Sequence, residues 1–214
     1  MRAALSPSIS SSRASAGSAR RSRPSAVSCH ASYVIGFDDA PFDRAHRGDV
    51  PVVGAVFNGE RLEGVVRGKV RRDGANATAS LARLASGSRF ASSLQAVFVQ
   101  GVTFGGFNVV DLDALCTALG LPVIAVCRRK PNLDKIRRAL LESVPGGRRK
   151  WRIIARLAPA RPHGDVYVQH AGIEWRHATA LVDRFARHSN LPEPLRTAHL
   201  IAGALAHGES RHRA

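Results

Sequence analysis

The chain has 214 residues, of which 32 are Lys or Arg and 16 are Asp or Glu, so its formal net charge is +16 at pH 7. This length fits one domain, or one domain with a tail. No stretch approaches the roughly 20 apolar residues that a bilayer crossing needs, so the sequence predicts no transmembrane protein. The three cysteines form no C-x-x-C pair and are odd in number. That pattern argues against a disulfide framework and a structural zinc site, and it predicts an intracellular protein.

The excess of positive charge points to a polyanionic partner. Nucleic acid is the commonest polyanion, although an anionic membrane surface also fits the charge. Most of the basic residues are Arg, and Ala is abundant. A GC-rich gene, in which Arg and Ala accumulate, is therefore another explanation of the positive charge, and it requires no polyanionic partner.

Residues 1–32 differ in composition from the rest of the chain, because they are rich in Ser and Arg and contain no acid. They show no apolar periodicity, so we expect a disordered basic tail. The same composition fits an organelle transit peptide, or a start codon assigned too early in the gene. The folded domain is expected over residues 33–214.

Three apolar strands are predicted first, at residues 33–37, 50–57 and 62–70, and Asn58-Gly59 forms the turn between the second and the third. Strands and helices then alternate. The predicted order is a helix from Asn76 or Thr78 to 85, a strand at 94–99, a helix at 109–119, a strand at 122–127 and a helix at 133–144. The last elements are an edge pair of strands at 151–157 and 166–169, and helices at 173–188 and 192–207. This order predicts an α/β protein with a mixed sheet flanked by helices.

Two adjacent carboxylates, Asp38 and Asp39, end the first predicted strand. Because side chains alternate along a strand, one should point to each face of the sheet. A carboxylate in such a place needs a cation or hydrogen-bond donors to offset desolvation. A metal site is one explanation, and an ordinary turn at the strand end is the other.

The remaining acids and the glycine-rich stretch have ordinary explanations. Asp111 and Asp113 begin a helix, where acids complement the macrodipole, and Asp73 precedes Gly74 in a turn. Residues 101–106 open a helix, as phosphate-binding loops do, but they match neither the P-loop nor the dinucleotide-binding motif.

Residues 127–156 contain eleven Lys or Arg and two acids. Their cations are expected to contact phosphates without reading sequence, and a solvated helix face is the alternative. The predicted phosphate-binding surface includes Arg128, Arg129, Lys130, Arg148, Arg149, Lys150 and Arg156. Near the C-terminus, Arg196 and His199 share one face of a predicted helix, and Arg196 is a further predicted nucleic-acid contact.

Several motifs together resemble a known family. They are G-F-D-D-A-P-F at 36–42, Asp73-Gly74, G-V-T-F-G-G-F-N-V-V-D at 101–111, G-L-P-V-I at 120–124, P-E-P-L-R at 192–196 with A-H-L-I at 198–201, and G-E-S at 208–210. The pattern resembles the endonuclease V-like family called domain of unknown function ninety-nine, whose best-described kind of member is endonuclease dU. The resemblance covers about residues 33–210.

The resemblance implies a ribonuclease H-like fold and a Mg²⁺- or Mn²⁺-dependent endonuclease that acts near deaminated bases in DNA repair. Its implied partner is nucleic acid, DNA more than RNA. Asp38 is the implied first-strand metal ligand, with Asp39 and Asp73 as further ligands. His199 matches a catalytic histidine on the C-terminal helix.

Two positions depart from the pattern that the resemblance to endonuclease V implies. Endonuclease V has carboxylates at both, whereas this chain has Asn76 and Gln100. Neutral amides can bind Mg²⁺ but add no charge. Three hypotheses follow. The chain is an active endonuclease, a weakened or inactive nucleic-acid-binding protein on the same fold, or an interaction protein that is basic only by composition. In the first, Phe42 either wedges against a base or belongs to the core.

Overall fold

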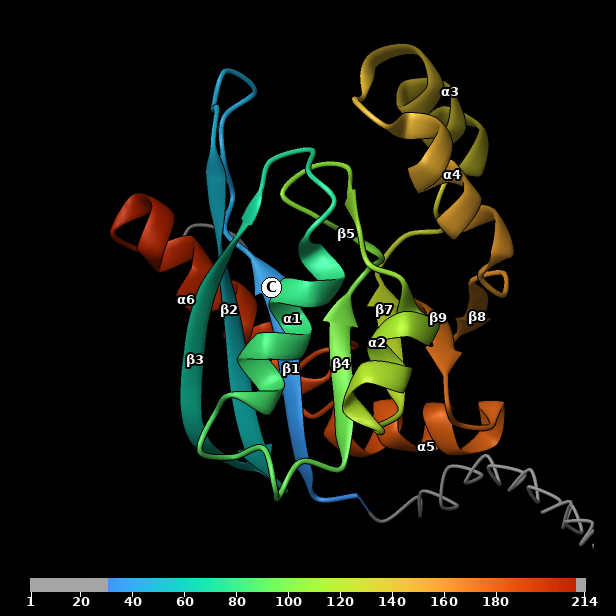
Figure 1. Cartoon of the computed structure of the whole chain (residues 1–214). Coiled ribbons are helices and arrows are strands. Elements are labelled where there is room, and N and C mark those ends of the chain that lie inside the picture. The colour runs from blue at the N-terminus through green and yellow to red at the C-terminus, as the bar shows by residue number, and fades with distance from the viewer. Residues whose placement is uncertain (1–30, 211–214) are drawn as a thin grey trace, which may run out of the picture.

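A seven-stranded mixed sheet lies at the centre of the structure, a computed structural model that describes residues 31–210 (Figure 1). The strand order is β3-β2-β1-β4-β7-β9-β8. The predicted tail, residues 1–32, lies outside the described residues except for its last two. The predicted α/β class with a mixed sheet and flanking helices is confirmed.

The first three strands form the predicted antiparallel meander. They are β1 (Tyr33–Asp39), β2 (Asp49–Asn58) and β3 (Arg61–Arg71). Their register places Asp38 opposite Val53, and Val53 opposite Arg67. These three residues therefore form one row across the sheet.

Two strands continue the sheet parallel to β1, namely β4 (Ala96–Gln100) and β7 (Val123–Cys127). The far edge is antiparallel and consists of β9 (Val166–Ala171) and β8 (Arg161–His163). A separate two-stranded pair, β5 (Thr103–Phe104) and β6 (Asn108–Val109), lies in the glycine-rich region. The carboxyl ends of β1 and β4 meet at one end of the sheet.

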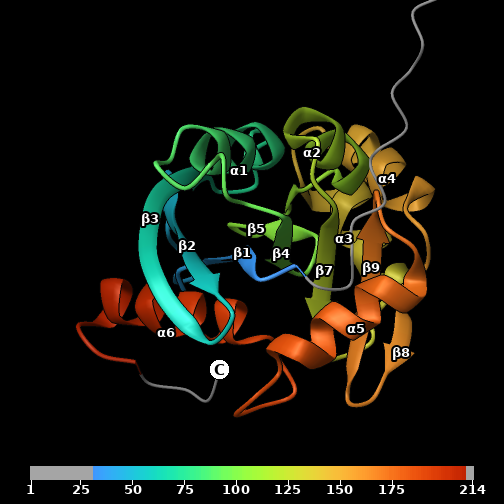
Figure 2. The ribbon, with the colours of Figure 1, turned by 90° about the horizontal axis from the view of Figure 1, so that it is seen from below.

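Helices cover both faces of the sheet (Figure 2). One face carries α1 (Ala77–Ser86) and α2 (Leu112–Leu119), and the other carries α5 (Trp175–Phe185) and α6 (Glu193–His207). A helix pair, α3 (Leu133–Ser143) and α4 (Gly147–Arg156), rises beyond the carboxyl ends of the central strands (Figure 1). Within residues 31–210, no helix combines the length and the apolar character that spanning a bilayer requires.

The expected strand at 151–157 was wrong, because this segment forms most of α4. Its apolar residues Trp151 and Ile154 are three positions apart, so a helix brings them together, and Ile154 packs with Leu140 of α3. The strand that pairs with β9 is instead residues 161–163. The second helix begins at Leu112 rather than 109, because Asp111 caps it with a hydrogen bond from the Ala114 N–H.

Candidate active site

Asp38 lies next to the end of β1, is only 5% exposed and faces α6. The imidazole Nδ1 of His199 on α6 lies 2.8 Å from Asp38 Oδ2. This contact depends on a close approach of α6 to β1. A Cβ added to Gly36 would lie 2.5 Å from the carbonyl carbon of Pro194, so only glycine leaves room for the start of the helix.

Burial and pairing set the protonation of this pair. Burial raises the pKa of the Asp38 carboxyl, and the hydrogen bond and charge of His199 partly oppose this rise. The hydrogen bond to Asp38 raises the pKa of His199. The positive charge of Arg128 lowers the pKa of both groups, which places this cation within electrostatic reach of the pair. The pairing thus favours the charged form of each group, and burial opposes it.

Gln100 is the polar residue beside Asp38 on the next strand. Phe37 is in register with Val99 on the parallel strand β4, so Gln100 is the neighbour of Asp38 and points to the same face. Its Oε1 is buried and has no hydrogen-bond partner within residues 31–210. A buried acceptor without a donor costs about 1–3 kcal/mol. The unsatisfied acceptor lies where one bound ligand would contact both Asp38 and Gln100.

Asp39 points to the opposite face, as the alternation predicts. Its Oδ2 accepts a hydrogen bond of 2.9 Å from the Gly105 N–H in the glycine-rich loop. Burial and the neighbouring charge of Asp38 raise the pKa of Asp39 to about 7. Asp38 and Asp39 therefore have different partners, although they are adjacent in the sequence.

Asp73 holds the same glycine-rich loop from the turn after β3. It adopts a left-handed backbone conformation with φ 49°. Its Oδ1 accepts a hydrogen bond of 2.8 Å from the Phe107 N–H, and its Oδ2 lies 3.2 Å from Arg72 Nε. Asp39 and Asp73 thus both bind this loop. Residues 31–210 contain no group of three or more His, Cys, Asp or Glu side chains arranged to hold a metal ion.

A second amide, Asn108, is the structural centre of this loop and was not predicted from the sequence. The residue is fully buried, and its Nδ2 donates to Asn76 Oδ1 at 2.7 Å and to the Arg71 carbonyl at 2.8 Å. Asn76 is therefore engaged in joining β3 to β6. The available signal was a polar residue between apolar ones, at Phe107-Asn108-Val109.

Three of the predicted basic residues are held by internal contacts. Lys150 is 4% exposed, its Nζ donates to the Asp73 carbonyl, and burial lowers its pKa. Arg156 pairs with Asp111, and Arg196 Nε lies 2.8 Å from Glu193 Oε2. Lys150 and Arg196 therefore have structural partners within the protein.

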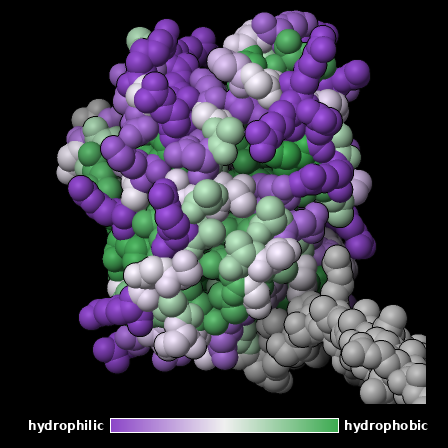
Figure 3. Space-filling model, viewed as in Figure 1, coloured by the Kyte–Doolittle hydropathy of each residue, from purple (hydrophilic) through white to green (hydrophobic). Residues whose placement is uncertain are grey.

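The exposed cations of this region gather on and below the α3–α4 pair. They are Arg128, Arg129, Lys130, Lys135, Arg137, Arg138, Arg148, Arg149 and Arg152, in addition to Arg156, which pairs with Asp111. Figure 3 shows hydrophilic side chains over this helix pair and over the opposite upper corner of the molecule. The α3–α4 pair rises beyond the end of the sheet where Asp38 lies (Figure 1).

Phe42 follows the site along the chain and packs against the core cluster on the α1 side of the sheet. The Arg72 guanidinium lies 5.6 Å from the centre of its ring, and His46 lies at 5.9 Å. The ring is half-buried, which agrees with its interpretation as a core residue.

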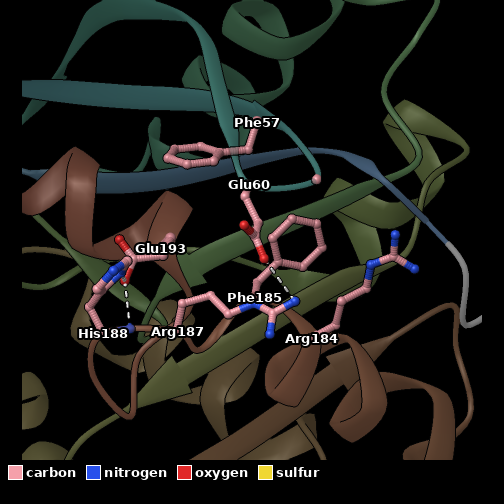
Figure 4. Close-up of a pocket in the computed structure, with 8 residues that line it drawn as sticks. Phe57, Glu60, Arg184, Phe185, Arg187, His188 and Glu193 are labelled. Atoms are coloured by element: carbon pink, nitrogen blue, oxygen red, sulfur yellow. Dashed lines mark hydrogen bonds and ion pairs between the residues drawn. The ribbon is translucent and has the colours of Figure 1, made fainter.

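A cavity of about 350 Å³ lies at the other end of β1 (Figure 4). Phe57, which lines it, is in register with Val34 near the start of that strand. Glu193 and His188 form a hydrogen bond at its edge, and Arg187 pairs with Glu60. None of the catalytic or metal-binding residues predicted from the sequence lines this cavity.

Comparisons with known proteins agree with the resemblance seen in the sequence. The family model described as endonuclease dU matches residues 30–206. A UPF0215 protein of Deinococcus radiodurans is 55% identical over 179 residues, which are 84% of this chain and 91% of that protein.

Solved structures share the architecture. A protein of unknown function from Archaeoglobus fulgidus superposes with a TM-score of 0.77 at 32% identity, over 82% of this chain and 99% of that one. Endonuclease V of Bacillus subtilis has a TM-score of 0.54 at 13% identity, over 82% and 81%. Endonuclease V of Ciona intestinalis, in complex with DNA containing an inosine, has a TM-score of 0.50 at 12% identity, over 78% and 82%. The chain therefore has the ribonuclease H-like fold of endonuclease V.

Proposed function

Because the chain belongs to the endonuclease dU family, we propose that it is a metal-dependent endonuclease that cleaves nucleic acid near deaminated bases, uracil or hypoxanthine, in DNA repair. The proposed substrate is DNA rather than RNA. The observation that carries the proposal is the buried pair of Asp38 and His199 at the end of β1, with Oδ2 and Nδ1 2.8 Å apart.

The residues beside this pair suit a hard divalent cation. Asp38 offers carboxylate oxygens, and Gln100 offers a buried amide oxygen that has no donor within the described part of the chain. Mg²⁺ is typically held by one or two carboxylates and keeps several waters, so a site with few protein ligands is sufficient. Asp38 and Gln100 would hold Mg²⁺ or Mn²⁺, and the ion would stabilise negative charge that develops on the phosphate.

His199 is the proposed proton donor. Its Nδ1 is engaged by Asp38, which leaves Nε2 as the other ring nitrogen, and its side chain is 31% exposed. The hydrogen bond to Asp38 raises the pKa of His199, which favours the protonated ring that a proton donor needs. The proton on Nε2 can pass to the oxygen that leaves phosphorus when water attacks. Asp38 orients the ring and favours its charged form.

The exposed cations on and below α3–α4 would contact the phosphates of the bound strand. Contacts of this kind position the nucleic acid without reading its sequence. Lys150 has another role in this proposal, because its ammonium group binds the Asp73 carbonyl inside the protein.

A second function is favoured by one specific observation. The acids Asp39 and Asp73 are held by the Gly105 and Phe107 N–H groups, and the neighbour of Asp38 on β4 is the neutral Gln100. The site therefore has less negative charge than a set of converging carboxylates. A nucleic-acid-binding protein with weak or no nuclease activity is the alternative.

A cleavage assay separates the two functions. The full chain and the variants Asp38→Ala and Asp43→Ala are incubated with DNA and RNA oligonucleotides that contain uracil or inosine, with Mg²⁺, Mn²⁺ or EDTA. Asp43 is an exposed acid in the loop between β1 and β2, so it serves as the matched control. Metal-dependent nicking that Asp38→Ala abolishes and Asp43→Ala retains is the expected result. Binding without nicking in either metal supports the alternative, and equal nicking by Asp38→Ala places the chemistry elsewhere.

A further inference from the structure

We infer that the outer surface of β3 is a second track for the sugar-phosphate backbone, on the side of Asp38 opposite to the α3–α4 pair. The track consists of Arg67, Lys69 and Arg71 on β3 and is hereafter called the β3 track. This inference rests on the proposed function, since it assumes that the bound partner is nucleic acid.

The register of the sheet aligns the β3 track with the candidate active site. Arg67 is paired with Val53, and Val53 is paired with Asp38, so the three lie in one row. Strands are about 4.8 Å apart, which puts the backbone of Arg67 roughly 10 Å from that of Asp38. Lys69 and Arg71 follow along β3 toward the end of the sheet at which β1 stops.

All three cations point to the α6 face and to solvent. The neighbouring Gly68 faces the other way, since a Cβ added there would contact Leu84 of α1. Arg67, Lys69 and Arg71 are therefore on the face that Asp38 shares, and all three are exposed. Alternate residues of a strand are about 6.6 Å apart. This spacing is comparable to that of successive phosphates along an extended strand.

A groove follows the β3 track where the C-terminal end of α6 passes β3. Its volume is about 410 Å³, and it is lined by Pro51, Arg67, Lys69 and Leu205 together with Asp49 and Gly68. Figure 2 shows α6 lying against this side of β2 and β3. The same helix carries His199, so α6 provides both the proposed proton donor and Leu205 in the lining of the groove.

Charge identifies the partner of this groove. The β3 track provides three cations, and Asp49 is the one carboxylate that lines the groove, 2.8 Å from Lys69. Basic side chains on an edge strand also prevent edge-to-edge pairing of sheets. That role requires no groove and no alignment with a buried carboxylate. A polyanion that lies along β3 and reaches Asp38 explains all three features.

The test compares salt-dependent binding of three forms of the full chain. The first is the wild type, the second is Arg67→Gln/Lys69→Gln/Arg71→Gln, and the third is Arg61→Gln/Arg176→Gln/Arg187→Gln. The three control cations are exposed, and each is paired with an acid. Both variants remove three positive charges, so the change in net charge is matched. Binding of a fluorescein-labelled uracil-containing oligonucleotide is followed by fluorescence anisotropy in EDTA, between about 50 and 200 mM salt.

The β3-track variant is expected to lose about tenfold or more in affinity at the lower salt, and the slope of log affinity against log salt should fall by about 2–3. The control variant should keep at least two-thirds of the wild-type slope. An unchanged slope in the β3-track variant overturns the inference. Light scattering provides a second test. If the wild type self-associates, the β3-track variant is monomeric and DNA binding is unchanged, the inference is also overturned, because a second copy of the chain would then cover β3.

Failure of the proposed function gives a different result. If the wild type does not nick DNA but binds it with the β3-dependent slope, the endonuclease proposal fails and the β3 track stands. If the wild type nicks DNA and the β3-track variant binds and nicks equally well, the β3 track fails and the endonuclease proposal stands. A wild type that does not bind the oligonucleotide overturns both.

Discussion

His199 Nδ1 and Asp38 Oδ2 lie 2.8 Å apart although 161 positions separate the two residues in the sequence. The first strand supplies the buried carboxylate, and the last helix supplies the imidazole above it. Each residue shifts the protonation of the other, since the hydrogen bond lowers the pKa of Asp38 against the effect of burial and raises that of His199. The two side chains therefore function as one titrating unit.

Replacing Asp38 should change the titration of His199. In Asp38→Asn the carboxylate charge is lost, so the pKa of His199 should fall below its wild-type value. The imidazole signals in NMR spectra recorded across a pH series measure this change. The NMR signals of the His163 ring, which contacts Asp183 at 2.7 Å rather than Asp38, serve as the control. An unshifted His199 would mean that the two groups are not coupled in solution.

The close approach of α6 to β1 predicts opposite effects for one substitution at two sites. Gly36→Ala places a methyl group against Pro194, and overpacking of this kind typically costs about 1–3 kcal/mol of unfolding free energy. Gly203→Ala lies within α6, where an added Cβ would meet only Ser210 at 3.8 Å, so it should stabilise by up to about 1 kcal/mol. Urea unfolding measures both. Equal effects of the two variants would contradict the close packing at Gly36.

The buried Oε1 of Gln100, which has no hydrogen-bond partner within residues 31–210, predicts how the affinity for divalent metal should respond to changes at this position. Gln100→Met keeps the size but removes the buried acceptor, so the unfolding free energy should stay constant or rise by about 1 kcal/mol, while Mn²⁺ binding weakens. Gln100→Glu adds a charge and should tighten Mn²⁺ binding by about tenfold, or 1.4 kcal/mol. Calorimetric titration with Mn²⁺ measures both changes. Unaltered affinity in both variants would exclude Gln100 as a ligand.

The sequence predicted the sheet well because its signals are local. The apolar runs of β1, β2 and β7 and the Asn58-Gly59 turn determine strands from neighbouring residues alone. Residues 151–157 were wrongly predicted as a strand, because a short apolar run does not distinguish a strand from a helix. Packing of Ile154 on Leu140 decides for the helix.

The site was predictable only in part. Alternation along β1 predicted that Asp38 and Asp39 face opposite sides. The partners of Asp39 and Asp73 could not be predicted, because they are backbone N–H groups of a loop that folds back from residues 105–107. The burial of Lys150 was equally hidden, because it depends on how α4 docks against the turn after β3.

Adjacent cations on α4 should behave differently when they are replaced. Lys150→Met removes the donor to the Asp73 carbonyl, so the unfolding free energy should fall by about 1–3 kcal/mol. Arg149→Gln changes an exposed side chain, so stability should change by less than about 0.5 kcal/mol, while the salt slope of DNA binding should fall by about 1. Thermal unfolding and fluorescence anisotropy provide the two measurements. A large stability loss in Arg149→Gln, or none in Lys150→Met, would contradict these assignments.

Asp39 predicts a pH dependence of stability in metal-free buffer. Burial and the charge of Asp38 raise its pKa from 3.8 to about 7 in the folded state, so between these values the folded protein binds more protons than the unfolded chain. The unfolding free energy should therefore be highest at acidic pH and should fall as the pH rises toward 7, with an upper limit of about 4 kcal/mol. The raised pKa values of Asp38 and His199 act in the same direction.

Two substitutions isolate the contribution of Asp39 to this pH dependence. Asp39→Asn should flatten the profile, which is measured by urea unfolding in EDTA from about pH 5 to 8. Asp49→Asn is the control, because the hydrogen bond from Lys69 lowers the pKa of Asp49, and this carboxylate contributes stability that is lost only as the pH falls through its lowered pKa. A profile that rises between pH 5 and 7 in the wild type, and equally in Asp39→Asn, would mean that the Asp39 carboxylate is ionised throughout and that the Gly105 N–H outweighs its burial.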